Sequence, residues 1–171
     1  LRSLSERGRL ANSWGADYFV SVHVNAGGGT GFESFVHTSQ ASRTVALRNV
    51  VHDEIMKALG PDVRDRGKKA ANFAVLRETK MPAILTENLF IDHPADAKKL
   101  HTNDFLKKVA RGHVEGIVRA FGLEKKAQPK PSQPKTESGV FYRVVTGSFS
   151  NRENAERRVA ELKKAGFESF I

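Results

Sequence analysis

The stretch that decides the fold is Tyr18-Phe-Val-Ser-Val-His23-Val-Asn25, a mostly apolar run that ends in a histidine and an asparagine. A glycine-rich turn, Gly27-Gly-Gly29, follows directly. This pattern predicts a buried β-strand whose C-terminal end presents an imidazole at the rim of a sheet. Because ligands of open α/β sheets bind at that rim, we expect His23 to lie close to a functional site.

A second segment follows the same plan. Pro82-Ala-Ile-Leu-Thr-Glu87-Asn88 predicts another buried strand, which delivers a carboxylate in place of an imidazole. Burying Glu87 among apolar neighbours is costly unless it has a partner or a chemical role. Together, His23 and Glu87 suggest a metal ligand and a general acid/base. Each also has a plainer interpretation, as a hydrogen-bonded core histidine and as a helix-capping or ion-paired carboxylate.

Strands and helices alternate along residues 1–123. Helices are predicted for residues 4–14, 42–59, 94–100 and 105–121, and strands for residues 18–25, 31–36, 73–76 and 83–86. The basic segment 62–69 is predicted to be a loop. This order is typical of an α/β domain with a mostly parallel sheet flanked by helices.

The composition excludes several classes of protein. Hydrophobic residues make up 39% of the 171, and no run approaches the roughly 20 apolar residues that cross a bilayer, so we expect no membrane insertion. There is no cysteine, which excludes disulfides and thiolate metal sites. The net charge of +9 predicts anionic surroundings or partners, such as nucleic acid, anionic lipid or cell-wall polymers. No nucleic-acid-binding motif accompanies this charge, so we expect no nucleic-acid partner.

Residues 124–139 predict a Pro- and Lys-rich linker, because they contain three prolines, no aromatic residue and no large apolar residue. Residues 140–171 then predict a strand, a helix capped by Asn151, and the start of a second strand at Phe167. A unit of this size cannot hold a core by itself. The chain begins within a predicted helix and ends within a predicted strand, so we expect it to be an internal piece of a longer protein.

The other five of the six histidines lack a partner at a ligand-like spacing. Two of them, His52 and His113, are each followed two residues later by a glutamate, which points in a different direction on a helix. The remaining three are His37, His93 and His101. We therefore expect none of the five to bind a metal.

Six ordered motifs add a family resemblance. They are Asn12-Ser-Trp-Gly-Ala-Asp17, Ser21-Val-His23-Val-Asn25, Gly31-Phe-Glu33-Ser, Asp65-Arg-Gly67-Lys, Asn72-Phe-Ala-Val-Leu-Arg77 and Met81-Pro-Ala-Ile-Leu-Thr-Glu87-Asn. In this order they resemble zinc-dependent N-acetylmuramoyl-L-alanine amidases, above all the sporulation and mother-cell-lysis branch of Gram-positive spore formers. The resemblance covers residues 1–121 and implies the zinc amidase fold with its N-terminal part missing. The segment after the linker resembles the first half of a SPOR domain, a peptidoglycan-binding module with a ferredoxin-like α+β fold.

The resemblance also implies roles for single residues. In this family Zn²⁺ is held by two histidines and one glutamate, and the Ser-Val-His-x-Asn motif makes His23 the last of these ligands. The strand that begins at Pro82 makes Glu87 the catalytic acid/base. The other ligands are implied to precede Leu1, so we expect this segment alone to be inactive. Leu89 departs from the family, which usually has glycine there, and we expect this to affect the backbone beside Glu87.

Three further residues are candidates for substrate binding, each with a structural alternative. Asn25 binds substrate or orients the loop that follows it. Glu33 lies near the site or pairs with the basic segment around Arg66. Arg77 contacts a peptide carboxylate or forms a surface ion pair.

The implied function is the hydrolysis of the amide bond between N-acetylmuramic acid and L-alanine in peptidoglycan. The protein is then expected to be a monomer in the extracellular space or cell wall, on the mother-cell side in a spore former, with peptidoglycan and anionic cell-wall polymers as partners. A non-catalytic peptidoglycan-binding protein, or a pseudoenzyme without a complete zinc site, is the alternative. A nucleic-acid-binding module is a third reading, favoured only by the net charge.

Overall fold

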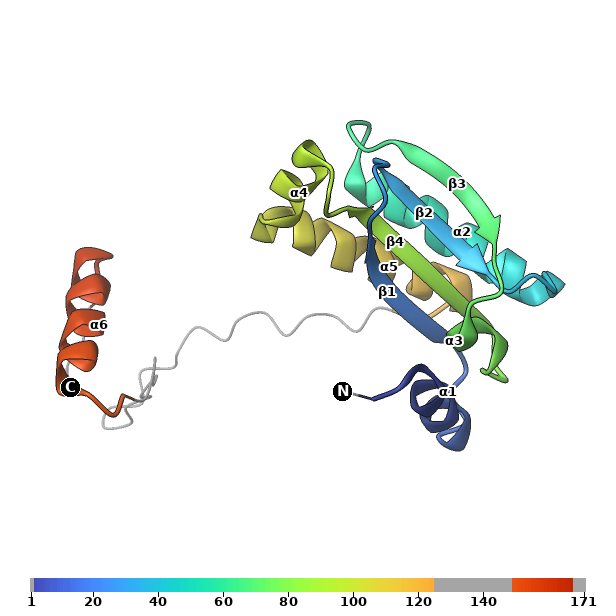
Figure 1. Ribbon diagram of the computed structural model, residues 1–171, viewed down its shortest axis with the longest axis horizontal. Coiled ribbons are helices and arrows are strands. Elements are labelled where there is room, and N and C mark those ends of the chain that lie inside the picture. The colour runs from blue at the N-terminus through green and yellow to red at the C-terminus, as the bar shows by residue number, and fades with distance from the viewer. Residues whose placement is uncertain (1, 125–148, 168–171) are drawn as a thin grey trace. The chain divides into compact units, whose positions relative to one another are not determined.

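The computed structural model describes residues 2–124 and 149–167. The chain divides into two compact units, Leu1–Lys126 and Ala127–Ile171. In the first unit, strands β1 (Phe19–Asn25), β2 (Phe32–Val36), β3 (Asp65–Ala70) and β4 (Ala83–Phe90) form a sheet in the order β1-β4-β2-β3 (Figure 1). β1 runs parallel to β4 and β2 runs parallel to β3, whereas β2 and β4 are antiparallel. The predicted α/β class, a mostly parallel sheet flanked by helices, is confirmed.

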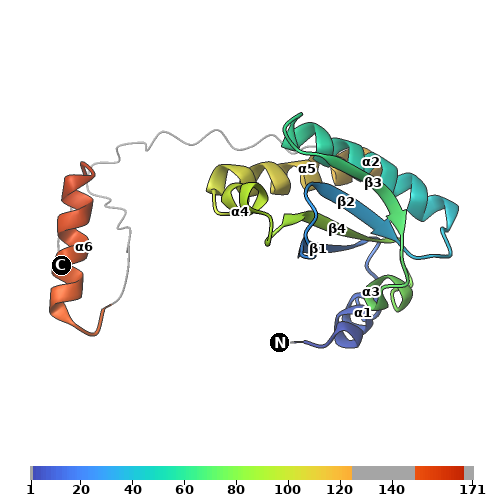
Figure 2. The same cartoon turned by 45° about the horizontal axis from the view of Figure 1, so that its top comes forward.

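Two long helices, α2 (Ser42–Leu59) and α5 (Asn103–Phe121), cover one face of the sheet (Figure 2). They pack closely because α5 carries glycine at two contact positions. A Cβ atom at Gly112 would lie 2.7 Å from the Cα of Ile55, and one at Gly116 would lie 2.7 Å from the Cα of Val51. The main hydrophobic core lies between these helices and the sheet. Its buried residues are Phe32, Val36, Val51, Ile55, Leu59, Val63, Ile84, Leu89, Phe105 and Val109.

The other face of the sheet carries α1 (Leu4–Ser13) and the short α3 (Ala74–Arg77). Val75 and Leu76 of α3 pack there with Ala83 and Leu85 of β4 in a second, smaller hydrophobic cluster. α4 (Pro94–Leu100) follows β4 and precedes α5. In the described part of the chain, no helix covers this face around His23 and Glu87, whose side chains are partly exposed.

Two predictions from the sequence are wrong. Residues 65–70 form the edge strand β3 instead of a loop, because their charged side chains find partners on the neighbouring elements, Arg66 with Glu33 and Lys68 with Asp53. Residues 73–76 lie mainly in helix α3 instead of a strand. Consecutive Val75 and Leu76 both enter the same cluster, which a helical turn permits and the alternation of a strand does not.

β4 contains a bulge beside the end of β1. The register runs from His23 opposite Glu87 to Asn25 opposite Phe90, so β4 accommodates one residue more than β1. Leu89 has φ +68°, in the left-handed region, and its side chain is fully buried in the main core. Position 89, where the resemblance implies glycine, thus has a glycine-like backbone. Burial of a leucine contributes about 1.5–3 kcal/mol, which offsets a strain of about 1–3 kcal/mol.

The described part of the second unit, residues 149–167, contains α6 (Arg152–Lys164), which confirms the predicted helix. Asn151 caps it, since its Oδ1 accepts a hydrogen bond of 2.8 Å from the backbone N–H of Glu153. Nearly all of the predicted strand at 141–149, of the strand expected from Phe167 onward and of the linker lies outside the described residues. None of the helices within residues 2–124 and 149–167 is long and apolar enough to cross a membrane.

The bulge at Leu89 should reverse the usual order in which an alanine variant is more stable than a glycine variant. Leu89→Ala should lower the free energy of unfolding by about 2–5 kcal/mol, because the core side chain is lost while the strain stays. Leu89→Gly should be no less stable than Leu89→Ala, because glycine relieves the strain. Ile84, fully buried on the same strand without a positive φ, is the control. There, glycine should be less stable than alanine by about 0.5–1 kcal/mol. The same order at both positions in urea unfolding would contradict this account.

A buried histidine should make the fold sensitive to acid. Nδ1 of His113 donates to the Val109 carbonyl at 2.8 Å, and its Nε2 accepts from the Thr86 hydroxyl at 3.0 Å. Burial lowers the pKa of His113 below its ordinary 6.5, although the bond to Val109 opposes this. The unfolded chain therefore binds the proton more readily, so stability should fall as the pH drops below about 6.5. The loss of melting temperature between pH 7.5 and pH 5 should be smaller in His113→Gln, and unchanged in a variant of the exposed His101.

Candidate functional site

Three chemically active side chains form a row across the open face of the sheet. His23 on β1 lies opposite Glu87 on β4, and Glu87 lies opposite Glu33 on β2. Paired residues on neighbouring strands project from the same face, so the imidazole and the two carboxylates are neighbours. The structure therefore brings together His23, Glu87 and Glu33, which come from three separate motifs of the sequence.

Glu87 is the middle residue of this row. Its Oε2 atom is buried and has no hydrogen-bond partner among the described residues. Burial raises the pKa of Glu87 to about 7, and the negative charge of Glu33 adds to this rise. A carboxyl group with such a pKa can both accept and release a proton near neutral pH.

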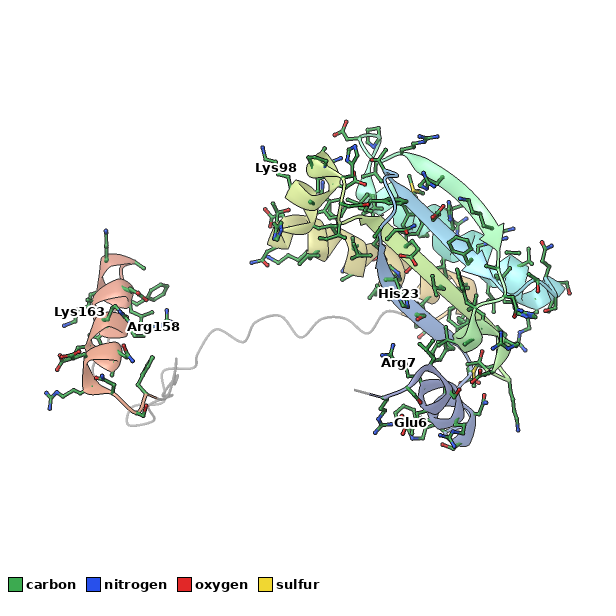
Figure 3. All side chains as sticks on the ribbon, in the orientation of Figure 1. Glu6, Arg7, His23, Lys98, Arg158 and Lys163 are labelled. Atoms are coloured by element: carbon green, nitrogen blue, oxygen red, sulfur yellow. The ribbon has the colours of Figure 1, made fainter. Side chains whose placement is uncertain are left out.

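His23 is partly buried and held from two sides. Its Nε2 lies 2.8 Å from the Ser21 hydroxyl, and its backbone carbonyl accepts a bond of 3.0 Å from the Asn88 amide. Burial, helped by the positive charge of Arg7, lowers the pKa of His23, which favours the neutral imidazole that binds metals. A cavity of about 420 Å³ between α1 and β1 is lined in part by His23, Arg7 and Trp14. Figure 3 shows His23 on β1 and Arg7 on the neighbouring α1.

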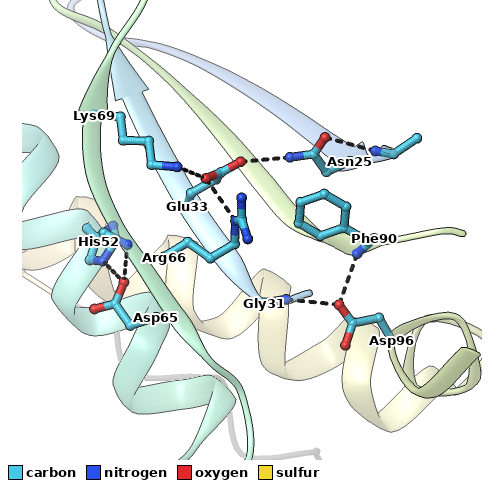
Figure 4. A network of polar contacts seen from close by, with 11 residues as sticks. Asn25, Gly31, Glu33, His52, Asp65, Arg66, Lys69, Phe90 and Asp96 are labelled. Atoms are coloured by element: carbon cyan, nitrogen blue, oxygen red, sulfur yellow. Dashed lines mark hydrogen bonds and ion pairs between the residues drawn. The ribbon is translucent and has the colours of Figure 1, made fainter. Parts of the chain in front are cut away.

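Glu33 is almost completely buried, with 4% of its surface exposed, and its two oxygens are fully engaged (Figure 4). Oε1 accepts a bond of 2.7 Å from the Asn25 amide. Oε2 accepts a bond of 3.0 Å from Nε of Arg66 and a second bond from Nζ of Lys69. Burial alone would raise the pKa of Glu33, but the bonds from Lys69 and Arg66 outweigh it and hold the pKa below its ordinary value. Glu33 is therefore an ionised carboxylate that joins the ends of β1, β2 and β3.

Two aspartates fix the glycine-rich loop between β1 and β2. Oδ2 of Asp92 accepts bonds of 2.7 and 2.8 Å from the backbone N–H groups of Gly27 and Gly28. Oδ2 of the buried Asp96 accepts bonds of 3.0 Å from the N–H of Gly31 and 3.1 Å from the N–H of Phe90. Sequence reasoning missed both aspartates, and the only signal was acidic residues at the start of α4. They fix the loop that connects Asn25, at the end of β1, to Glu33, which is a member of the row.

A serine, a histidine and an aspartate are also aligned, but on the buried face. The Ser34 hydroxyl lies 2.8 Å from Nδ1 of His52, and Nε2 of His52 lies 3.0 Å from Oδ1 of Asp65. Ser34, at 0% exposed, and His52, at 1%, are both hidden from solvent between β2 and α2. Because the serine cannot meet a substrate, these residues tie α2 to β2 and β3 and are not a nucleophilic triad.

Arg77 lies apart from the row. Its Nη1 donates to the Asn72 side chain at 2.8 Å, and its Nη2 lies 3.4 Å from Oε1 of Glu78. These contacts agree with the surface ion pair considered from the sequence. Its binding to a substrate carboxylate stays a prediction.

The residues present fit part of a metal site. Within residues 2–124 and 149–167, no three histidine, aspartate or glutamate side chains gather so that they could hold a metal ion. His23 offers a neutral imidazole next to a cavity, and Glu87 offers an unpaired carboxylate oxygen. This donor set suits one ligand and one proton carrier of a metal-dependent hydrolase, and a complete metal site would require further ligands.

Family models and curated relatives identify the same family for this chain. Residues 2–119 match the family described as N-acetylmuramoyl-L-alanine amidase, and residues 122–171 match the SPOR domain. The chain is 46% identical over 169 residues to the N-acetylmuramoyl-L-alanine amidase CwlM of Bacillus licheniformis, covering 99% of this chain and 62% of the relative. It is 44% identical, with the same coverage, to the sporulation-specific N-acetylmuramoyl-L-alanine amidase of Bacillus subtilis. The chain thus spans 62% of the length of these curated relatives.

Solved structures agree with the fold. The catalytic domain of CwlV, an N-acetylmuramoyl-L-alanine amidase from Bacillus (Paenibacillus) polymyxa, superposes with a TM-score of 0.67 and 32% identity. The match covers 72% of this chain and 68% of that domain.

The loop contacts of Asp96 predict a large effect of its removal. Asp96→Ala leaves two buried backbone N–H groups without an acceptor, so the free energy of unfolding should fall by about 2–4 kcal/mol. Asp92 makes the same number of backbone contacts, but they are exposed. Asp92→Ala should therefore lower the free energy of unfolding by less than Asp96→Ala does. Equal effects of the two substitutions in urea unfolding would show that the burial of these contacts is unimportant.

Proposed function

The chain belongs to the N-acetylmuramoyl-L-alanine amidase family, and from this premise we propose that it hydrolyses the amide bond between N-acetylmuramic acid and L-alanine in peptidoglycan. One observation carries the proposal. His23 and Glu87 are direct neighbours on parallel strands, and the Oε2 atom of Glu87 is buried without a partner among the described residues. A hydrolase needs such an oxygen to carry a proton, and a structural carboxylate does not leave one unpaired.

We propose Zn²⁺ as the cofactor and His23 as one of its ligands. A zinc ion held there would polarise the scissile carbonyl and lower the pKa of water to about 7. The bonds to Ser21 and Asn88 hold the strand and ring of His23 in place, as the partners of metal-ligating histidines usually do. The remaining ligands are proposed to come from residues outside those that the structure describes.

Glu87 performs the proton transfers in this proposal. Its Oε2 takes a proton from the attacking water and returns it to the nitrogen of L-alanine, which leaves as an amine. Glu33 has the opposite task, because its oxygens are fully bonded and its charge is permanent. It holds Asn25 and the cations of β3 around the site and exchanges no proton.

Peptidoglycan is the proposed partner of both units, since the second unit matches the SPOR domain. This implies a protein of the cell wall or envelope, and we propose that it acts as a monomer. The net charge of +9 supports retention on anionic cell-wall polymers. A role in sporulation, on the mother-cell side, follows from the likeness to a relative that is named sporulation-specific.

Substitutions at the two central residues test the proposal in the full-length protein. Glu87→Gln should retain zinc but reduce hydrolysis at least about a hundredfold, because the proton carrier is lost. His23→Ala should lose both zinc and hydrolysis. His37→Ala, at a histidine whose bonds to Ser39, Asn72 and Thr38 are exposed, is the control that should keep both.

Two measurements are needed, the zinc content per protein and the release of new L-alanine amino termini from purified peptidoglycan. Near-normal turnover by Glu87→Gln would remove Glu87 from the mechanism. A wild-type protein that binds peptidoglycan but neither holds zinc nor releases amino termini would favour the non-catalytic alternative.

A further inference from the structure

Arg66 on β3 is fixed in an unusual way beside the row. Its Nε donates to Glu33 at 3.0 Å, and its guanidinium lies over the ring of Phe90, 4.8 Å from the ring centre. The Phe90 ring in turn packs against the backbone of Gly29, where a Cβ atom would lie only 2.5 Å from it. Arg66 is therefore held in its plane by an ion pair at the edge and by a cation–π contact on the face.

The fixed guanidinium still has donors to offer. Among the described residues only Nε of Arg66 is hydrogen-bonded, which leaves the terminal amino groups Nη1 and Nη2 for another partner. Lys69 lies on the same face of β3, with 39% of its side chain exposed. Both cations share the single carboxylate of Glu33, so the group retains a positive charge. Figure 4 shows the two cations converging on Glu33 from β3.

The distance to Glu87 suits a peptide. β3 lies two strands away from β4, and strands are spaced about 4.8 Å apart, so Arg66 is roughly 10 Å from Glu87 across the sheet. An extended peptide advances about 3.3–3.6 Å per residue, and the arginine side chain reaches back toward the site. A substrate whose scissile amide lies at Glu87 therefore brings the residue after L-alanine within reach of Arg66.

We propose that Arg66, supported by Lys69, binds a carboxylate of the peptide part of the substrate, on the residue that follows L-alanine. The enzyme then discriminates between peptides in which this carboxylate is free and peptides in which it is amidated. This inference rests on the proposed function, which sets the scissile amide at Glu87. A guanidinium with two parallel free donors matches the geometry of a carboxylate, whereas a neutral carboxamide offers it a single acceptor.

The test compares two muramoyl peptides that differ only in whether this carboxylate is free or a carboxamide. In the full-length protein, the ratio of kcat/KM for the acidic over the amidated substrate should fall about tenfold in Arg66→Gln, mainly through KM. Arg66→Lys should restore part of the ratio. Lys68→Gln is the matched control, because Lys68 is on the same strand but pairs with Asp53 at 2.6 Å. It should leave the ratio unchanged.

A binding measurement separates this inference from the amidase proposal. The same proteins are titrated, followed by NMR, with a dipeptide of L-alanine and the residue that carries this carboxylate, and with its amide. The wild type should prefer the acidic dipeptide, and Arg66→Gln should lose this preference. If the wild type hydrolyses neither substrate but shows this preference, the amidase proposal fails and the recognition by Arg66 stands. If it hydrolyses both substrates and Arg66→Gln keeps the wild-type ratio, the recognition is overturned and the amidase proposal stands.

Two further results would also overturn the inference. An equal loss on both substrates in Arg66→Gln would mean that Arg66 only supports Glu33. Inorganic phosphate that competes as strongly as the acidic dipeptide would mean that the site accepts anions in general, such as the phosphates of wall polymers.

Discussion

β4 is hydrogen-bonded to β1 on one side and to β2 on the other, and its register decides which side chains face the open side of the sheet. Glu87 lies between His23 and Glu33 only in this register. A slip by one residue would exchange Glu87 with Thr86 or Asn88, which are now buried beneath the helices. The bulge at Leu89 then turns the strand so that Leu89 enters the core and Phe90 lies beneath Arg66. The chemistry of the site thus depends on hydrogen bonds of the backbone and on one strained residue.

The neighbouring carboxylates Glu33 and Glu87 have different pKa values because their surroundings differ. Glu33 is nearly completely buried, yet Arg66 and Lys69 keep it ionised. Glu87 has no cation at bonding distance among the described residues, and the charge of Glu33 adds to the effect of burial on its pKa. The two environments therefore push the pKa values of two identical groups in opposite directions. One carboxylate serves as a fixed charge and the other as a group that can change its protonation.

How much could be predicted from the sequence follows from the range of the interactions. His23 and Glu87 could be placed at strand ends, because apolar runs and their polar ends are local signals. The long helices were predictable for the same reason. β3 was not, because its charged residues become a strand only by pairing with Glu33 and Asp53, far away in sequence. For that reason the environment of Glu33 and the fixed position of Arg66 could not be predicted either. The aspartates that hold the glycine-rich loop were missed because the loop residues that they bind lie more than sixty positions away.

The close approach of α5 to α2 determines how rigid the strands beneath the site are. Since Gly112 and Gly116 bring α5 onto the backbone of α2, the spacing of these helices is set by atoms that have no rotamers to change. His52 of α2 is in turn bonded to Ser34 of β2 and Asp65 of β3. The strands that carry Glu33 and Arg66 therefore rest on a stiff support. The backbone of the sheet therefore does not move when a molecule binds to this face. Side chains and the loop between β1 and β2 adjust to the shape of the bound molecule instead.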